Sequence, residues 1–199
     1  MDSSSGELNP DQKQFLLIAK NNVDRLNRLI NDVLDFSKLE AKKIEFNMKL
    51  NDLTSVINEA VNTHKISAEQ KGLKLNLEVK NEIPKLIFDS DRIIQVLINL
   101  MNNAIKFTDR GGIVVSLSFE DDRKNVKICV VDTGRGISPD DIPFLFQKFK
   151  QLEDINGRST GGTGLGLAIC KEIVDQHKGK IWIDSKLGIG SSFCFTLPV

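Results

Sequence analysis

A chain of 199 residues, 40% of them hydrophobic and 27% charged, is long enough to bury a full core and predicts one domain with an appendage. Its 27 basic and 27 acidic residues give no net charge, which disfavours a nucleic-acid-binding protein. No apolar run approaches the roughly 18 to 20 residues that cross a bilayer, and the opening MDSSSGELNP does not resemble a signal peptide, so we expect a cytoplasmic chain without membrane contact.

The first predicted element is a long helix. Residues 1–8 are expected to form a flexible leader, and Asn9 with Gln12 can form a capping box before a helix from about 10 to 42. Apolar residues recur three and four positions apart, as in a heptad seam, at Leu16, Ala19, Val23, Leu26, Ile30 and Val33, with Leu29 and Phe36 widening the face. Because one helix cannot bury this face alone, we expect a bundle or dimer element.

The remaining sequence mixes strand and helix patterns. Helices are predicted over 52–70, 90–106 and 165–177, and strands over 44–50, 73–79, 85–89, 112–120, 125–132, 180–185 and 191–197. Polar or glycine-containing turns join the last four strands into two hairpins. These elements predict an α+β fold, a two-layer sandwich in which helices cover one face of a mixed, largely antiparallel sheet.

Three cysteines occur in apolar surroundings. Cys129, Cys170 and Cys194 have neither CxxC spacing nor a nearby histidine. We therefore expect buried reduced thiols rather than a disulfide or a metal site.

Two asparagines and a lysine interrupt the apolar helix predicted over 90–106. Asn99 and Asn103 lie one turn apart, and Lys106 lies about one turn further on. They could form a polar stripe facing solvent, as Asn102 suggests. Alternatively, the amide oxygens could bind a hard cation such as Mg²⁺, which takes its other ligands from water and phosphates.

Two glycine-containing segments follow. Asp132 ends a strand and precedes Gly134 and Gly136, which is typical of an unliganded turn but also places a carboxylate in a cleft, where it could accept a hydrogen bond from an exocyclic amine. Residues 160–169, TGGTGLGLAI, open a helix. They could be a plain loop or a phosphate site, but they lack the Gly-Lys-Ser/Thr ending of a P-loop and the preceding strand of a dinucleotide fingerprint.

Taken in order, these motifs resemble the Bergerat-type ATP site of gyrase, heat-shock-90, sensor histidine kinases and mismatch-repair ATPases. The resemblance covers residues 44–199 and rests on four separate motifs: Asn-x-x-x-Asn-x-x-Lys, Asp-x-Gly-x-Gly, Phe146-x-x-Phe149 and Gly-x-Gly-x-Gly. QVLINLMNNAIKFT, VVDTGRGISPDDIPFLFQKF and GGTGLGLAICKEIV look specifically like a sensor histidine kinase of a two-component system.

The resemblance implies roles for these positions. Asp132 accepts the adenine amine, and Gly134 and Gly136 let the base lie against the loop. Asn103, with Asn99 beside it, holds Mg²⁺, while Lys106 reaches the phosphates. The implied ATP contacts also include Phe107, Ile137, Phe149, Lys150, Gly162, Thr163, Gly164, Leu165 and Gly166. Of these, Gly162, Gly164 and Gly166 frame the phosphates and hinge a lid over about 150–163. In the family, a basic residue after the phenylalanine pair is often directed toward the γ-phosphate, and Lys150 stands there.

Asn99 separates the kinases from their hydrolytic relatives, in which a glutamate at this position activates water. An amide cannot accept a proton at neutral pH, so Asn99 favours transfer to another nucleophile. Residues 9–43 resemble the second helix of the kinase dimerisation and phosphoacceptor hairpin, whereas the helix carrying the acceptor histidine is expected to be missing. His64 and His177, the only histidines, lack the acceptor motif and are expected to be structural or surface residues.

We therefore expect the ATP-binding catalytic portion of a sensor histidine kinase, which phosphorylates a histidine on another helix for onward transfer to a response regulator receiver domain. The parent is expected to dimerise through the N-terminal helix, and the sequence leaves open whether it is anchored to a membrane. Two alternatives remain: a slow ATPase or ATP-gated switch of the same superfamily, and a non-enzymatic dimerisation module with a vestigial pocket.

Overall fold

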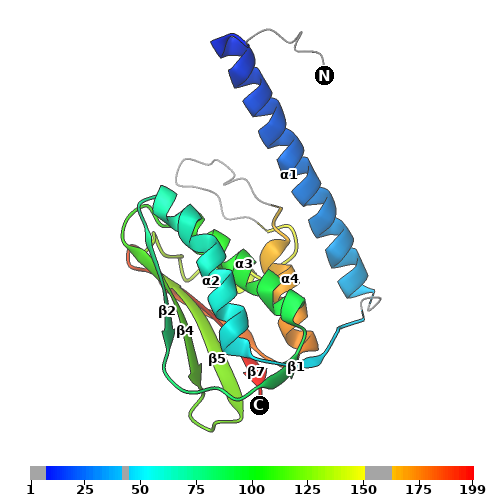
Figure 1. The fold of residues 1–199 in the computed structure, drawn as a ribbon, viewed down its shortest axis with the longest axis vertical. Coiled ribbons are helices and arrows are strands. Elements are labelled where there is room, and N and C mark those ends of the chain that lie inside the picture. The colour runs from blue at the N-terminus through cyan, green and yellow to red at the C-terminus, as the bar shows by residue number, and fades with distance from the viewer. Residues whose placement is uncertain (1–7, 42–44, 151–162) are drawn as a thin grey trace.

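The computed structural model describes residues 8–41, 45–150 and 163–199. A two-layer α+β sandwich follows a long N-terminal helix, and the predicted fold class is confirmed (Figure 1). The elements in chain order are α1 (Pro10–Glu40), β1 (Lys49–Asn51), α2 (Leu53–Gln70), β2 (Lys74–Val79), β3 (Leu86–Phe88), α3 (Ser90–Phe107), β4 (Gly112–Phe119), β5 (Asn125–Asp132), a 3₁₀ turn (Ile142–Phe144), α4 (Gly166–Gln176), β6 (Ile181–Lys186) and β7 (Gly190–Pro198).

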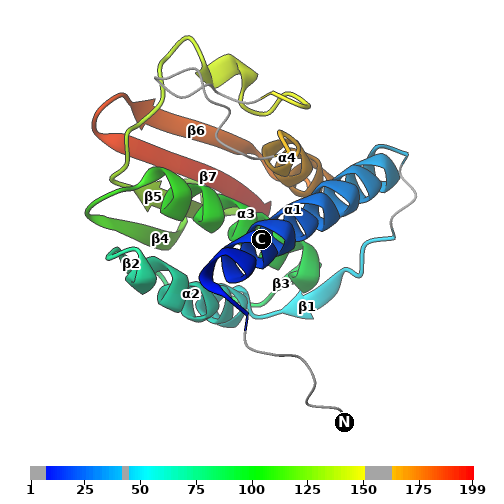
Figure 2. The ribbon, with the colours of Figure 1, turned by 90° about the horizontal axis from the view of Figure 1, so that it is seen from above.

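Five strands form the main sheet in the order β2-β4-β5-β7-β6. β2 runs parallel to β4 and the other neighbours are antiparallel, so both predicted hairpins, β4–β5 and β6–β7, are confirmed. Alternate residues of β4 (Ile113, Val115 and Leu117) are buried, as the period of two in a strand requires. The helices α2, α3 and α4 cover one face of the sheet (Figure 2).

The predicted strand over 44–50 is wrong in extent. Among the described residues 45–51, only Lys49–Asn51 forms a strand, and it pairs with β3 in a separate two-stranded sheet. Side-chain contacts hold the preceding residues instead. The Asn47 N–H donates to the Asp89 carboxylate at 2.8 Å, and Phe46 packs edge-on against His177. This segment is therefore tied to the ends of α3 and α4, not to a neighbouring strand.

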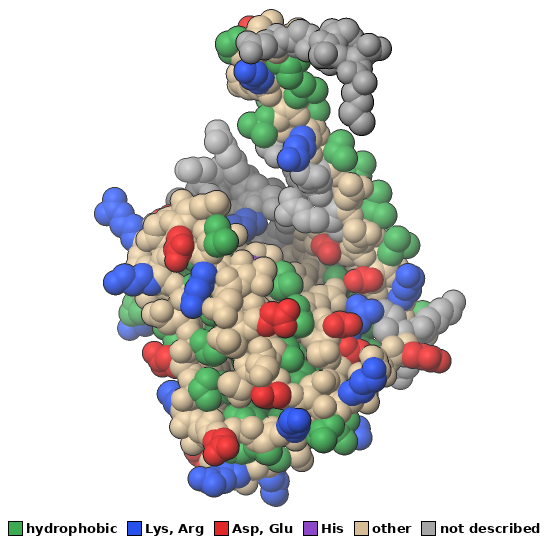
Figure 3. Space-filling view, viewed as in Figure 1, with side chains coloured by type: hydrophobic (Ala, Val, Ile, Leu, Met, Phe, Trp, Pro, Cys, Tyr) green, Lys and Arg blue, Asp and Glu red, His purple; other side chains and the backbone are tan. Residues whose placement is uncertain are grey.

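The helix α1 begins with the predicted capping box, since the Asn9 and Gln12 side chains each bond to the backbone N–H of the other residue. Most of its apolar seam is exposed, with 55% of Leu16 and 56% of Leu26 accessible, and hydrophobic side chains are visible along its length (Figure 3). Among the described residues, no helix combines the length and hydropathy needed to cross a bilayer.

Among the described residues, the last turns of α1 are the part of this helix that packs on the rest of the protein. Leu39 is buried in the main core, and Phe36 packs against it. Asp35 accepts a hydrogen bond from the Gln95 amide at 3.1 Å and lies 3.8 Å from the Arg92 guanidinium, so α1 is also held to α3. One end of α1 is therefore anchored while the other extends away from the sandwich.

Candidate functional site

The polar side of α3 faces the start of α4. Asn99 and Asn103 are half-buried, unlike the exposed Asn102. The Asn99 amide oxygen lies 3.3 Å from the position that a Cβ atom on Gly166 would occupy, and its side chain hydrogen-bonds with Cys170. Asn99 therefore borders a helix N-terminus, where unpaired backbone N–H groups can bind an anion.

Asp132 ends β5 and lies in a buried position, with 6% of its surface accessible. Burial raises the pKa of its carboxyl group, although hydrogen bonds from the Gly134 and Ser191 N–H groups oppose this shift. The Gly134 N–H donates to Asp132 Oδ1 at 2.8 Å. A carboxylate that is costly to bury and is held by backbone donors is a strong acceptor for a ligand that brings a donor.

The end of α3 is joined to the loop that follows Asp132. The Arg135 N–H donates to the Phe107 carbonyl at 3.4 Å, and a Cβ atom on Gly134 would overlap that carbonyl. Glycine is therefore required at 134 because the two backbones approach closely. Since a helix rises about 1.5 Å per residue, α3 sets a separation of about 12 Å between Asn99 and Phe107.

The part of the glycine cluster that the structure describes closes against the residues before the expected lid. The Phe149 N–H donates to the Gly164 carbonyl at 3.0 Å, and the Thr163 hydroxyl accepts from the Leu165 N–H at 3.1 Å. Gly164 has a φ of 71°, which favours glycine. Leu165 is buried and precedes α4, which begins at Gly166. Gly162 and the lid positions 151–162 lie outside the described residues.

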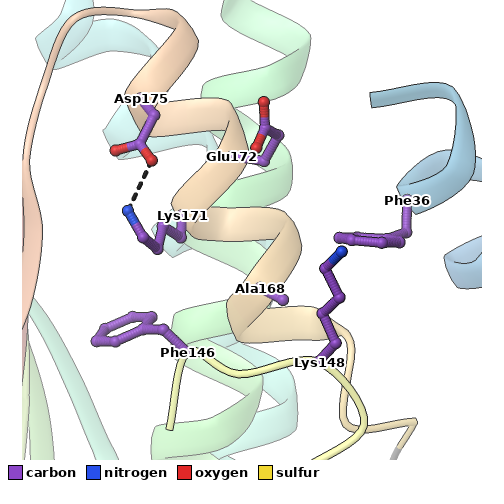
Figure 4. Close-up of a pocket in the computed structure, with 7 residues that line it drawn as sticks. All are labelled: Phe36, Phe146, Lys148, Ala168, Lys171, Glu172 and Asp175. Carbon is purple, nitrogen blue, oxygen red and sulfur yellow. Dashed lines mark hydrogen bonds and ion pairs between the residues drawn. The ribbon is translucent and has the colours of Figure 1, made fainter. Parts of the chain in front are cut away.

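The predicted aromatic and basic residues lie in two regions, one beside the Asp132 loop and one around residues 144–150. Lys106 lies 4.9 Å from the Phe107 ring centroid, next to the Asp132 loop. Lys150 lies 5.3 Å from the Phe144 ring, and Phe149 is exposed. Phe146 instead lines a cavity of about 200 Å³ between α1 and α4 together with Phe36, Lys148, Ala168, Lys171, Glu172 and Asp175 (Figure 4).

The cysteines correct one expectation. Cys170 is a buried free thiol, as predicted, and burial raises its pKa to about 12. The expectation of reduced thiols at Cys129 and Cys194 is wrong, because a disulfide joins them with a sulfur–sulfur distance of 2.06 Å. They stand directly opposite each other on β5 and β7. The sequence does not show this register, because the two residues are 65 positions apart.

Sequence reasoning also missed the contacts behind the Asp132 loop. The Ser185 hydroxyl on β6 accepts from the Ile137 N–H at 2.9 Å, and it lies 3.0 Å from the Ser191 hydroxyl. The Gly188 N–H donates to the Arg135 carbonyl at 2.7 Å. Only the turn glycines between the last two strands hinted that this hairpin reaches the site.

Both histidines have hydrogen-bond partners within the fold. His177 is buried, its Nδ1 bonds to the Ile173 carbonyl at 2.8 Å, and its Nε2 accepts from the Asp89 N–H at 3.0 Å. Burial lowers the pKa of His177 and favours the neutral ring. His64 bonds to the Ala60 carbonyl within α2.

Comparison with known proteins agrees with this arrangement. Residues 88–199, which hold every predicted site residue, match the family described as histidine kinase-, DNA gyrase B-, and HSP90-like ATPase, and the chain belongs to this family. Residues 1–42 match the His Kinase A (phospho-acceptor) domain. Together these matches identify the catalytic ATPase domain of a sensor histidine kinase, following part of a His Kinase A region.

Individual relatives support the same assignment. Sensor histidine kinase WalK of Bacillus subtilis is 34% identical over 190 residues, which are 93% of this chain and 30% of WalK. ShkA, solved full-length in complex with AMPPNP, has a TM-score of 0.83 and 31% identity, covering 97% of this chain and 40% of ShkA. Histidine kinase ThkA, solved with the response regulator protein TrrA, has a TM-score of 0.75 and 27% identity, covering 96% of this chain and 53% of ThkA. The chain spans less than a third of the length of the curated relatives it matches.

Proposed function

We propose that residues 44–199 bind Mg-ATP and transfer its γ-phosphate to a histidine on a dimerisation helix outside this chain. The observation that carries this proposal is that the buried carboxylate of Asp132, followed by its glycine loop, lies at one end of α3, while Asn99 borders the N-terminus of α4 further along the same helix. This arrangement offers an acceptor for a base and donors for phosphates, separated by a rigid element.

At the base end, Asp132 accepts a hydrogen bond from the adenine amine, and the loop of Gly134, Gly136 and Ile137 lies against the ring. Two backbone hydrogen bonds fix the Asp132 carboxylate before ATP arrives, so this side chain loses little conformational entropy on binding. Phe107 supports this loop through its carbonyl group.

At the phosphate end, the N-terminus of α4 attracts the phosphates. The glycines at 162, 164 and 166, with Thr163 and Leu165, form the rim, and Lys150 supplies positive charge. Lys106, whose ammonium lies beside the Phe107 ring, would reach the phosphates from the base end of α3.

The amide oxygens of Asn103 and Asn99 suit Mg²⁺, which prefers oxygen ligands. Among the described residues, no group of three or more His, Cys, Asp or Glu side chains could hold a metal ion. A cation here would therefore take most of its ligands from phosphates and water, which fits a metal delivered with the nucleotide. When bound, Mg²⁺ neutralises phosphate charge.

Asn99 favours transfer over hydrolysis because its amide cannot accept a proton from water. The buried Cys170 beside it cannot replace a base or nucleophile, since its pKa is about 12. The hydrogen-bond partners of His64 and His177 within the fold also argue against either as the phosphate acceptor. We therefore assign the acceptor to a separate helix, and residues 9–43 to the second helix of that hairpin.

The exposed apolar face of α1 supports a homodimer of the parent protein through this helix. ThkA was solved with a response regulator, which supports a receiver domain as the final phosphate acceptor for this chain as well. Because the proposed reaction consumes ATP, we expect it to take place in the cytoplasm.

Calorimetric titration with Mg-ATP tests the binding step. Asp132→Ala and Asn103→Ala should abolish binding, whereas the control His64→Ala should leave it intact. The reverse pattern would mean that the site is misplaced. If ATP failed to raise the melting temperature of the unaltered chain, the pocket would be vestigial.

Incubation with γ-labelled ATP tests the transfer step. The chain alone should stay unlabelled, and an added polypeptide with the phosphoacceptor helix should become labelled. Strong labelling of the chain itself would overturn the assignment of the acceptor. Steady phosphate release that is lost on changing Asn99 would instead support the alternative, a slow ATPase.

A further inference from the structure

The turn between β6 and β7 packs against the loop of residues 133–137 that follows Asp132. A Cβ atom on Gly136 would overlap the Lys186 carbonyl, and the Gly188 N–H donates to the Arg135 carbonyl at 2.7 Å. The loop and the turn are therefore in close backbone contact. Movement of either would displace the surface against which a base lies.

Ser185 is the side chain that links these two segments. Its hydroxyl oxygen accepts from the Ile137 N–H at 2.9 Å and lies 2.9 Å from the Gly190 carbonyl, to which it donates. A hydroxyl has one proton, so the 3.0 Å contact with Ser191 requires the Ser191 hydroxyl to be the donor. All of the hydrogen-bonding capacity of Ser185 is thus used between the loop and the hairpin.

The same hairpin also contacts Asp132. The Ser191 N–H donates to the Asp132 carboxylate, and a Cβ atom on Gly190 would overlap the Asp132 carbonyl. Ser185 and Ser191 are direct partners in the β6–β7 ladder. Ser185 therefore joins the residue that fixes the carboxylate to the segment that follows the glycine loop.

We propose that Ser185 is a positioning residue for nucleotide binding. It holds the 134–137 loop in the position in which a base can lie on the loop and reach Asp132. This inference rests on the proposed function, because it concerns how the same site accepts adenine. Ser185 acts only through the loop and the hairpin, so it should influence the base end of the nucleotide and not the γ-phosphate.

The test compares Ser185→Ala with Ser185→Thr, which keeps the hydroxyl and suits a strand. Ser192→Ala is the matched control, because Ser192 lies on the same hairpin but its hydroxyl contacts the Cys194 sulfur instead. Affinities for Mg-ATP and Mg-ADP are measured by calorimetry. Hydrogen exchange of the Ile137 amide is followed by NMR in the nucleotide-free proteins.

Ser185→Ala should speed exchange at Ile137 and weaken both nucleotides by a similar factor, about three- to tenfold for one hydrogen bond. Ser185→Thr should restore affinity, and Ser192→Ala should bind normally. Equal affinity of Ser185→Ala and the unaltered chain would overturn the inference, as would a loss confined to ATP. If the unaltered chain bound no Mg-ATP, the proposed function itself would fail.

Discussion

Replacing Asp132 with asparagine separates its binding role from its structural role. The substitution keeps the shape of the side chain and the acceptor for the Gly134 N–H, but it removes the charge and one acceptor oxygen. A hydrogen bond to a charged group contributes about 1.5–3 kcal/mol. Loss of the charged acceptor for the adenine amine should therefore weaken Mg-ATP binding by about ten- to a hundredfold.

The same substitution should not lower the stability of the nucleotide-free protein. Burial raises the pKa of Asp132 above its unfolded value, so the ionised carboxylate opposes folding at pH values above the folded pKa. This cost disappears as the pH falls and the carboxyl group is protonated. Near pH 7, Asp132→Asn should consequently melt at the same temperature as the unaltered chain or higher, and ATP affinity of the unaltered chain should fall on acidification.

Calorimetry and thermal melting measure the two quantities on the same samples. Asp140→Asn is the control, since it removes an exposed carboxylate from the segment after the loop. Unchanged affinity for ATP in Asp132→Asn would refute the binding role. A melting temperature several degrees lower would instead mean that the carboxylate is a structural turn residue.

Three further predictions concern the Asp132 loop, His177 and the disulfide. Gly136→Ala should abolish ATP binding and lower the melting temperature, because the residue has a φ of 67° and no space for a side chain, whereas Gly72→Ala, with a φ of 73° and open space around it, should leave binding intact. Burial lowers the pKa of His177 in the folded protein. The unfolding free energy measured in urea should therefore be constant above the unfolded pKa of about 6.5 and should decrease as the pH falls through the lower folded pKa. The variant His177→Gln should remove this dependence. The Cys129–Cys194 disulfide joins residues 65 positions apart. On the chain-entropy model, its reduction should lower the unfolding free energy by about 4 kcal/mol. A variant with serine at both positions should not respond to reductant.

The long elements of the fold were predictable because their patterns are local. The capping box at Asn9 and the period-two alternation in the strand from Gly112 to Phe119 involve neighbouring residues. The segment 45–48 was not predictable in this way. Its apolar Phe46 suggests a strand, but its partner, His177, comes from the other end of the chain.

The candidate site shows the same division. Asp132, Asn99 and the glycines could be proposed as site residues because each motif is short and the order of the motifs is distinctive. Ser185 was missed because a serine at the end of a strand also suits a solvent-exposed edge. Its role depends on the position of the loop at Ile137, 48 residues away. The pairing of Cys129 with Cys194 was missed for a similar reason, since it depends on strand register.

The two ends of α1 bear on how this domain would reach its proposed acceptor. The last turns are fixed to the sandwich by Leu39 and by the contact of Asp35 with Gln95, whereas the apolar residues near the start, such as Phe15, are exposed. A large exposed apolar face needs a covering partner in solution. Because Asp35 binds α3, the helix that also carries Asn99, a partner helix packed along α1 would have a defined orientation relative to the proposed phosphate end. The distance between the nucleotide and the acceptor helix would then be set by the packing of α1 and its partner. Because Asn99 cannot activate water, phosphate transfer at this site would depend on that distance.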